Sequence, residues 1–137
     1  MLKVINGLGK KIRHIAFAML LLPCITLMSF QTDVALELLG ALKSNNAKNV
    51  ANLFGQNISL SIKNDSGYYS KFQAEVMLSD FFRTSKTTEV KQVQRTNSSN
   101  NSFYIVYQIK TGQGSYRVFV KFNQSGGEAQ INELRIE

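Results

Sequence analysis

The clearest hydrophobic pattern in this chain lies between Ser102 and Phe122, where two apolar runs rich in aromatic residues flank the turn sequence Thr111-Gly112-Gln113-Gly114. A two-residue loop is the commonest connection in a β-hairpin, and here it consists of Gly112 and Gln113. One face of the hairpin then pairs only apolar or aromatic residues, and a slip of one residue would turn half of them over. The predicted cross-strand pairs are Ile109 with Tyr116, Tyr107 with Val118, Ile105 with Val120, and Phe103 with Phe122.

Helical periodicity dominates the part of the chain before this hairpin. The segment 33–44 has apolar residues at i, i+3, i+4 and i+7, with Thr32 or Asp33 as the N-cap. A second, shorter helix is expected from Ala47 to Leu53. A third is expected from Lys71 to Arg83, because Ser70 and Gln73 have capping-box spacing. The candidates for burial on the third helix are Phe72, Val76, Phe81 and Phe82.

Strand patterns occupy most of the remaining chain. The segment 58–62 alternates strictly between apolar and polar residues, and Tyr68-Tyr69 is interpreted as a short returning strand. The segment 87–96 is interpreted as a polar strand with a bulge or a partly exposed position, since Val90 and Val93 fall on opposite faces. A polar loop follows at 97–101. In the last strand, 129–137, a loop centred on Gly127 places Leu134 opposite Val120 and Ile136 opposite Val118.

The order of these elements predicts the fold class. Two helices, a strand and a third helix precede a four-stranded antiparallel meander. The apolar face of the central hairpin must be covered, and the helices are the available cover. The sequence therefore predicts an α+β fold in which a curved antiparallel sheet wraps on three N-terminal helices.

The first thirty residues have the pattern of an export leader. Lys3, Lys10, Lys11 and Arg13 precede an uncharged apolar run from Ile15 to Phe30, which is short for a membrane-spanning helix of about 20 residues. We interpret residues 1–30 as a signal peptide and residues 31–137 as one domain. Two alternatives remain, an uncleaved N-terminal anchor and lipid modification at Cys24. The expected location is periplasmic or extracellular, anchored to the envelope in the two alternatives, and membrane contact is expected only through an uncleaved leader.

Removal of that leader changes the composition in ways that limit function. The chain carries a formal net charge of +7, and loss of the four basic leader residues leaves +3, which argues against nucleic-acid binding. The only cysteine, Cys24, and the only histidine, His14, also lie in the leader. The remaining chain then has no disulfide, no Ser-His or Cys-His catalytic pair and no metal-ligand motif. We expect no cofactor, no metal and no catalytic residue.

Several short segments resemble an uncharacterised family of small secreted Bacteroidetes proteins. The family belongs to the nuclear transport factor 2-like superfamily, whose cystatin-like fold is a cone of curved sheet wrapped on helices. The resemblance spans the chain after the leader, and it implies this fold and export but no activity. The segments that carry it are Tyr69-Ser70-Lys71, Gln73-Ala74-Glu75, Phe81-Phe82, Gly114-Ser115-Tyr116-Arg117-Val118 and 131–137.

The interior of such a cone suggests one candidate site. Tyr107 and Tyr116 are predicted to point toward the helices, where buried phenol groups need hydrogen-bond partners. With Phe82 and Asp80 on the third helix they are candidates for lining a pocket for a small apolar ligand. The competing interpretation, which we favour, is that the tyrosines are core aromatics and that Asp80 is solvated, since the pattern forces no carboxylate inward to act as a base.

The outer face of the sheet suggests a second candidate site. Tyr104, Val106, Phe119 and Ile131 are predicted to form an apolar patch there, which is the anatomy of a protein interface. Scattered exposed hydrophobic residues are the alternative, and the pattern does not decide between them. The charged residues predicted to flank the patch are Arg117, Lys121, Glu133 and Arg135.

These observations favour an exported, non-enzymatic domain that works by binding, as a homodimer through the outer sheet face or with another envelope component. The alternative is a small-molecule carrier or a cofactor-free enzyme of the isomerase or dehydratase type that uses the cone pocket. A filled cone would favour the binding domain. An open cavity that contains an ionisable residue with a shifted pKa would favour the carrier or enzyme.

Overall fold

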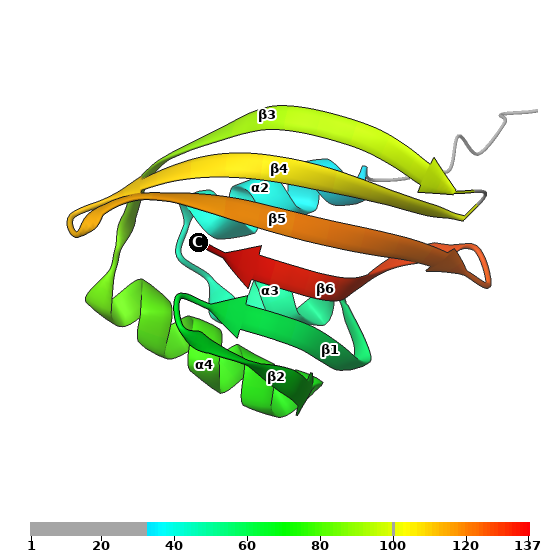
Figure 1. Cartoon of the computed structure of the whole chain (residues 1–137), viewed down its shortest axis with the longest axis horizontal. Coiled ribbons are helices and arrows are strands. Elements are labelled where there is room, and N and C mark those ends of the chain that lie inside the picture. The colour runs from blue at the N-terminus through cyan, green and yellow to red at the C-terminus, as the bar shows by residue number, and fades with distance from the viewer. Residues whose placement is uncertain (1–32, 100) are drawn as a thin grey trace, which may run out of the picture. The chain divides into compact units, whose positions relative to one another are not determined.

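The computed structural model of the protein describes residues 33–99 and 101–137, so the expected leader and its processing site lie outside the described residues. The described elements follow the predicted order (Figure 1). They are α2 (Val34–Lys43), α3 (Ala47–Asn52), β1 (Phe54–Ile62), β2 (Asp65–Ser70), α4 (Lys71–Thr84), β3 (Thr87–Ser99), β4 (Ser102–Thr111), β5 (Gly114–Ser125) and β6 (Glu128–Ile136).

The strands form one curved six-stranded sheet in the order β2-β1-β6-β5-β4-β3. The helices of the described residues lie along one side of it, as Figure 1 shows. The α+β class, the curved sheet and the three helices are confirmed. One feature differs from the expected all-antiparallel sheet, because β1 pairs with β6 in parallel. The helix α4 separates the β1–β2 hairpin from the meander, so no local turn determined how β1 and β6 would run.

The central hairpin has the predicted register throughout. Strands β4 and β5 pair Phe103 with Phe122, Ile105 with Val120, Tyr107 with Val118 and Ile109 with Tyr116. Seven of these eight side chains are buried and Tyr116 is partly buried. The hairpin is therefore the inner wall of the core.

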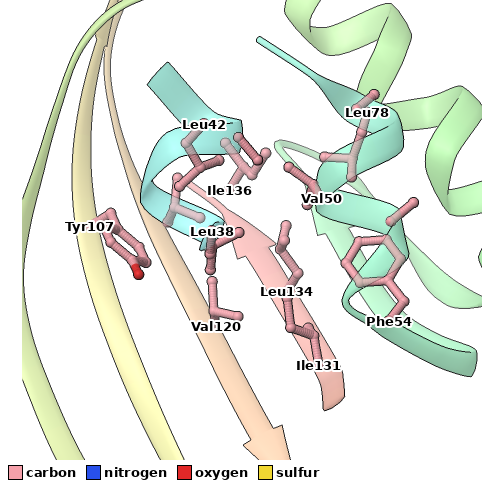
Figure 2. Close-up of a cluster of buried hydrophobic side chains, with 14 of the residues drawn as sticks. Leu38, Leu42, Val50, Phe54, Leu78, Tyr107, Val120, Ile131, Leu134 and Ile136 are labelled. Atoms are coloured by element: carbon pink, nitrogen blue, oxygen red, sulfur yellow. The ribbon is translucent and has the colours of Figure 1, made fainter. Parts of the chain in front are cut away.

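The core lies between this wall and the helices. Figure 2 shows Leu38 and Leu42 of α2, Val50 of α3 and Leu78 of α4 gathered around the inward side chains of the sheet. Val120, Leu134 and Ile136 contribute from β5 and β6, where Leu134 pairs with Val120 and Ile136 with Val118, as predicted. Each of these side chains is almost entirely removed from water, so hydrophobic burial holds the helices on the sheet.

Side chains close the helix ends, and the sequence identified those at the starts of α2 and α4. Asp33 caps α2 by accepting a hydrogen bond from the Ala35 amide at 3.1 Å. Ser70 and Gln73 form the complete capping box at the start of α4. After α2, Asn45 adopts a left-handed conformation with φ 54°. Its amide group exchanges two hydrogen bonds with the backbone of Thr87, at 3.0 and 2.8 Å, and so ties the end of α2 to the start of β3.

The prediction for the buried face of α4 was wrong in part. Phe81 and Phe82 are buried as expected, but Phe72 and Val76 are exposed to water. The helix is apolar around most of its circumference, so its sequence did not single out one face. Packing chose the face with Ala74 and Leu78, whose spacing of four residues continues to Phe81 and Phe82.

The polar strand β3 contains the expected irregularity and extends further than predicted. Its pairing with β4 shifts between Thr87 and Glu89, between Gln92 and Gln94, and again near Ser99. Val93 therefore stands at a bulge and is half exposed. The predicted loop at 97–101 is shortened because β3 continues to Ser99.

Candidate functional site

The sheet has an outer face, turned away from the helices, that carries a small aromatic cluster. The pairing of Val106 with Phe119, and of Phe119 with Arg135, places these side chains side by side on β4, β5 and β6. The rings of Tyr104 and Phe119 are 5.2 Å apart. Val106 is 1% exposed and stands outside the main core, so it is covered on the outer face by its neighbours. We call Tyr104, Val106 and Phe119 the outer cluster.

Charged side chains surround the outer cluster. The guanidinium of Arg135 lies over the Phe119 ring, 4.4 Å from its centroid, which is the geometry of a cation–π contact. Arg135 also forms ion pairs with Glu133 at 3.3 Å and with Glu137 at 3.4 Å. Its Nε atom is buried without a hydrogen-bond partner, so the contact with Glu133 is a charge pair lacking hydrogen-bond geometry.

Two shallow hollows open on this outer face, with volumes of about 320 Å³ and 510 Å³. They share Arg117 and Glu137, whose backbones exchange hydrogen bonds of 2.7 and 2.9 Å. Among the described residues, Arg117 has no ion-pair partner, and its side chain is exposed. The first hollow is lined by Gln94, Tyr104, Val106, Arg117, Phe119, Arg135 and Glu137. The second is lined by Val93, Gln108, Ser115, Tyr116, Arg117 and Glu137.

Three of the four interface candidates lie together on the outer face, and the fourth is buried in the core. Tyr104, Val106 and Phe119 form the outer cluster, but Ile131 is 0% exposed and belongs to the core. The expected placement of Ile131 on the outer face was wrong because the β5–β6 pairing shifts between Lys121 and Phe122. Ile131 pairs with Phe122 instead of Asn123, and this turns its side chain inward.

Two lining residues were missed by sequence reasoning. Val93 and Gln94 of β3 border the hollows, yet the sequence placed neither among the site candidates. They come to this face because β3 pairs as an edge strand beside β4 and bulges between Gln92 and Gln94. The expected bulge in the segment 87–96 was the available signal.

The four pocket candidates do not converge on one space. Tyr107 is fully buried and donates a hydrogen bond to the Ala35 carbonyl of α2 at 3.2 Å. Tyr116 contacts Phe81 of α4 edge to face at 5.5 Å, and the Lys63 ammonium lies 5.3 Å from its ring.

The two candidates on α4 have separate roles as well. Phe82 is a buried core residue beside Phe81, with ring centroids 5.7 Å apart. Asp80 is exposed and pairs with Arg83 at 2.7 Å. The idea that Asp80 lines the interior is therefore wrong, because its carboxylate faces water from the surface of α4.

The Tyr107 hydroxyl is placed as a donor and not as a base. Burial raises the pKa of Tyr107 above its ordinary value of 10.0, the Asp33 carboxylate raises it further, and the Arg95 guanidinium partly opposes both effects. Asp33 and Arg95 are themselves paired at 3.4 Å. The phenol consequently keeps its proton at neutral pH and ties β4 to the first turn of α2.

Replacing Tyr107 with Phe keeps the ring and removes this hydrogen bond. We expect a loss of about 1 kcal/mol in the free energy of unfolding near neutral pH. Above pH 10 the unfolded chain releases the Tyr107 proton while the folded protein retains it, so wild-type stability falls as the pH rises. The variant should fall less steeply, and urea titrations near neutral pH and above pH 10 measure both effects. Parallel pH dependence in the two proteins would contradict this role.

Neither a metal site nor a membrane span is found in the part of the chain that the structure describes. No group of three or more His, Cys, Asp or Glu side chains within residues 33–99 and 101–137 could hold a metal ion. No helix in the same ranges is both long and apolar enough to cross a membrane. The outer face presents aromatic and charged side chains beside two shallow hollows.

Comparison with known proteins identifies relatives of the whole fold. Residues 37–137 match a family model described as a domain of unknown function (DUF4783). A crystal structure of a DUF4783 family protein from Bacteroides uniformis is similar with a TM-score of 0.72 and 24% identity, covering 77% of this chain and 96% of that chain. A DUF4783 family protein from Bacteroides ovatus is similar with a TM-score of 0.69 and 18% identity, covering 73% and 90%.

A third solved structure is similar to this chain in its fold. A domain of unknown function with a cystatin-like fold from Nostoc punctiforme has a TM-score of 0.59 at 10% identity, and the match covers 74% of this chain and 70% of that chain. No curated protein matches this chain. These likenesses between structures show the fold alone.

Proposed function

The chain belongs to the DUF4783 family, a family of unknown function with the nuclear transport factor 2-like, cystatin-like fold. We propose that this protein works by binding another protein through its outer sheet face. The partner we propose is a second copy of the chain, so that the working form is a homodimer. The observation that carries the proposal is the outer cluster, an apolar centre on a sheet face that no other element of the described residues covers, with charges of both signs around it. This arrangement is the anatomy of a protein interface.

A face that meets its own copy must be complementary to itself. In a two-fold contact each surface supplies both halves of every interaction. The outer face carries the cation Arg117, which has no ion pair among the described residues, close to Glu137, which shares Arg135 with Glu133. Two such faces placed antiparallel bring Arg117 of each copy toward the acidic residues of the other, while the outer clusters meet at the centre.

The core supports binding over catalysis. The phenol that the sequence offered for a pocket, Tyr107, is fully buried, hydrogen-bonded and held protonated. Asp80, the carboxylate offered as its companion, lies on the surface in a pair with Arg83. Neither of these two candidates is therefore placed to act as the accessible acid or base that a cofactor-free isomerase or dehydratase needs.

We further propose that the domain acts after export. The basic and apolar pattern of residues 1–30 supports a signal peptide, which places the domain in the periplasm or outside the cell. Retention of that segment, or lipid attachment at Cys24, would anchor the same domain to the envelope. Mass spectrometry of the mature protein recovered from its native cells, which reads the N-terminus directly, tests this.

The dimer is tested by replacing Phe119 with Glu. A carboxylate at the centre of a two-fold contact faces its own copy, so like charges meet and the apolar contact is lost. The fold should tolerate the change because residue 119 is only partly buried and lies beside Arg135. We expect light scattering to give a mass of at least two chains for the wild type and a lower mass for the variant, which has lost this contact, with unchanged circular dichroism.

The matched control is Leu36→Glu. Leu36 is an exposed apolar residue on α2, on the helical side of the sheet, so the same gain of charge should leave the dimer intact. A wild-type protein with the mass of a single chain, or a Phe119→Glu variant with the same mass as the wild type, would overturn the proposal. Saturable uptake of a small apolar ligand by the single chain would instead favour the carrier.

A further inference from the structure

The two edges of the sheet are protected to different degrees. Among the described residues, β2 and β3 are the edge strands, and an edge strand presents unpaired backbone groups to any strand that approaches. Natural proteins blunt such edges with bulges and charged side chains. β3 has both, since its pairing shifts three times and it carries Glu89, Lys91 and Arg95.

The other edge has no bulge, and its one charged side chain is that of its first residue, Asp65. β2 pairs with β1 in continuous register from Asp65 to Ser70, without a bulge, a proline or a lysine. Tyr68, which pairs with Ser59, is 75% exposed on the outer side of the sheet. In Figure 1 this strand runs along the lower margin of the sheet, next to α4. Phe72, near the start of α4, adds a second exposed aromatic ring.

The two ends of this edge carry opposite charges. Asp65 is the first residue of β2, and Lys71 follows its last residue. In the part of the chain that the structure describes, neither side chain forms an ion pair. A strand that is acidic at its start and basic just beyond its end is complementary to an antiparallel copy of itself, because each acidic end meets a basic one.

The register of such a pair follows from the side-chain faces. Opposed residues in an antiparallel pair share a face, so a two-fold contact that keeps both helical layers on one side pairs residues of equal parity. The register with Tyr68 opposite its own copy joins two aromatic rings at the axis and brings Asp65 near Lys71, which begins α4 just beyond the end of the strand. Shifting this register by two residues in one direction would place Lys63 near Lys71 of the other copy, which repels it. Shifting it by two residues in the other direction would shorten the paired stretch of the two β2 strands.

We infer that the free edge of β2 is a self-association site, where a second copy of this chain adds its own β2 antiparallel, with Tyr68 against Tyr68 and Asp65 against Lys71. The contact is separate from the outer face and does not rest on the outer-face dimer. It extends the sheet of one copy into that of the next. If each chain uses both the β2 contact and the outer-face contact, it binds two different neighbouring copies. The assembly then contains more than two chains.

Charge reversal tests this contact specifically. In Asp65→Lys the two ends of β2 are both basic, and in Lys71→Asp both are acidic, so each variant repels its own copy. A mixture of the two variants restores both ion pairs across the contact. We expect an N-terminally labelled Asp65→Lys protein to bind unlabelled Lys71→Asp protein at least about tenfold more tightly than unlabelled Asp65→Lys protein, as measured by fluorescence-detected sedimentation.

The controls make the same charge changes elsewhere. Glu128→Lys and Lys48→Asp alter exposed residues away from β2, so their mixture should show no such preference. Introducing Phe119→Glu into both edge variants should leave the tenfold preference unchanged, which separates this contact from the outer-face dimer. Equal affinity of the mixed and unmixed edge variants, with circular dichroism showing both folded, would overturn the inference.

Discussion

Replacing Phe122 with Ala should lower the free energy of unfolding by about 3–5 kcal/mol, the range typical of a phenylalanine removed from a packed core. Phe122 is 0% exposed and lies on β5 between β4 and β6. Its ring stacks on Phe103 with centroids 4.7 Å apart and an interplanar angle of 8°. The truncation therefore removes apolar burial, leaves a cavity and strips the stacking partner from Phe103.

Urea denaturation followed by circular dichroism measures this loss. Phe72→Ala is the matched control, because the same atoms are removed from a side chain that is 73% exposed. Its effect should stay within about 0.5 kcal/mol. Equal effects of the two substitutions would contradict the burial of Phe122 and the exposure of Phe72 together.

Ile131→Ala is the second substitution with a large expected effect, a loss of about 2–5 kcal/mol. Ile131 is fully buried, pairs with Phe122 on β5 and with Phe54 on β1, and so stands where three strands meet. The substitution opens a cavity there. Backbone pairing holds the three strands in place, so the surrounding structure cannot close the cavity.

The same urea titration distinguishes the two placements of this residue. Val93→Ala, at a half-exposed position on the bulged strand β3, should change stability by no more than about 0.5 kcal/mol and serves as the control. A loss for Ile131→Ala as small as that of the control would place Ile131 on the outer face, as the alternation of the sequence alone suggested.

The inner wall of the core could be predicted residue by residue. Alternation along the segment 102–122 and the loop at Gly112-Gln113 both specify one register, and the structure has that register in every pair from Phe103 with Phe122 to Ile109 with Tyr116. Local chemistry also predicted the start of α4, because the hydrogen bonds of its capping box join residues only three apart. Period and capping are short-range properties, so they can be read without knowing what packs where.

The candidate site could be predicted only in outline. Tyr104 and Phe119 lie opposite the hydrophobic face of the hairpin, so the same alternation that located the core also located the outer cluster. Ile131 could not be placed in this way. The β5–β6 pairing shifts between Lys121 and Phe122, so the β6 residues up to Ile131 face the side opposite to the one that alternation predicts. Val93 and Gln94 entered the hollows through the bulge of β3, whose position depends on β4 and not on the sequence of β3 alone.

The sequence by itself determined the helices, the hairpin register and the α+β order, because each depends on residue spacing within a few turns or across one tight loop. Tertiary structure decided which face of α4 is buried, that β1 runs parallel to β6, and which strands became edges. Those features depend on contacts between segments far apart in the chain. For those features, packing and strand pairing select one of several arrangements that the local sequence pattern does not distinguish.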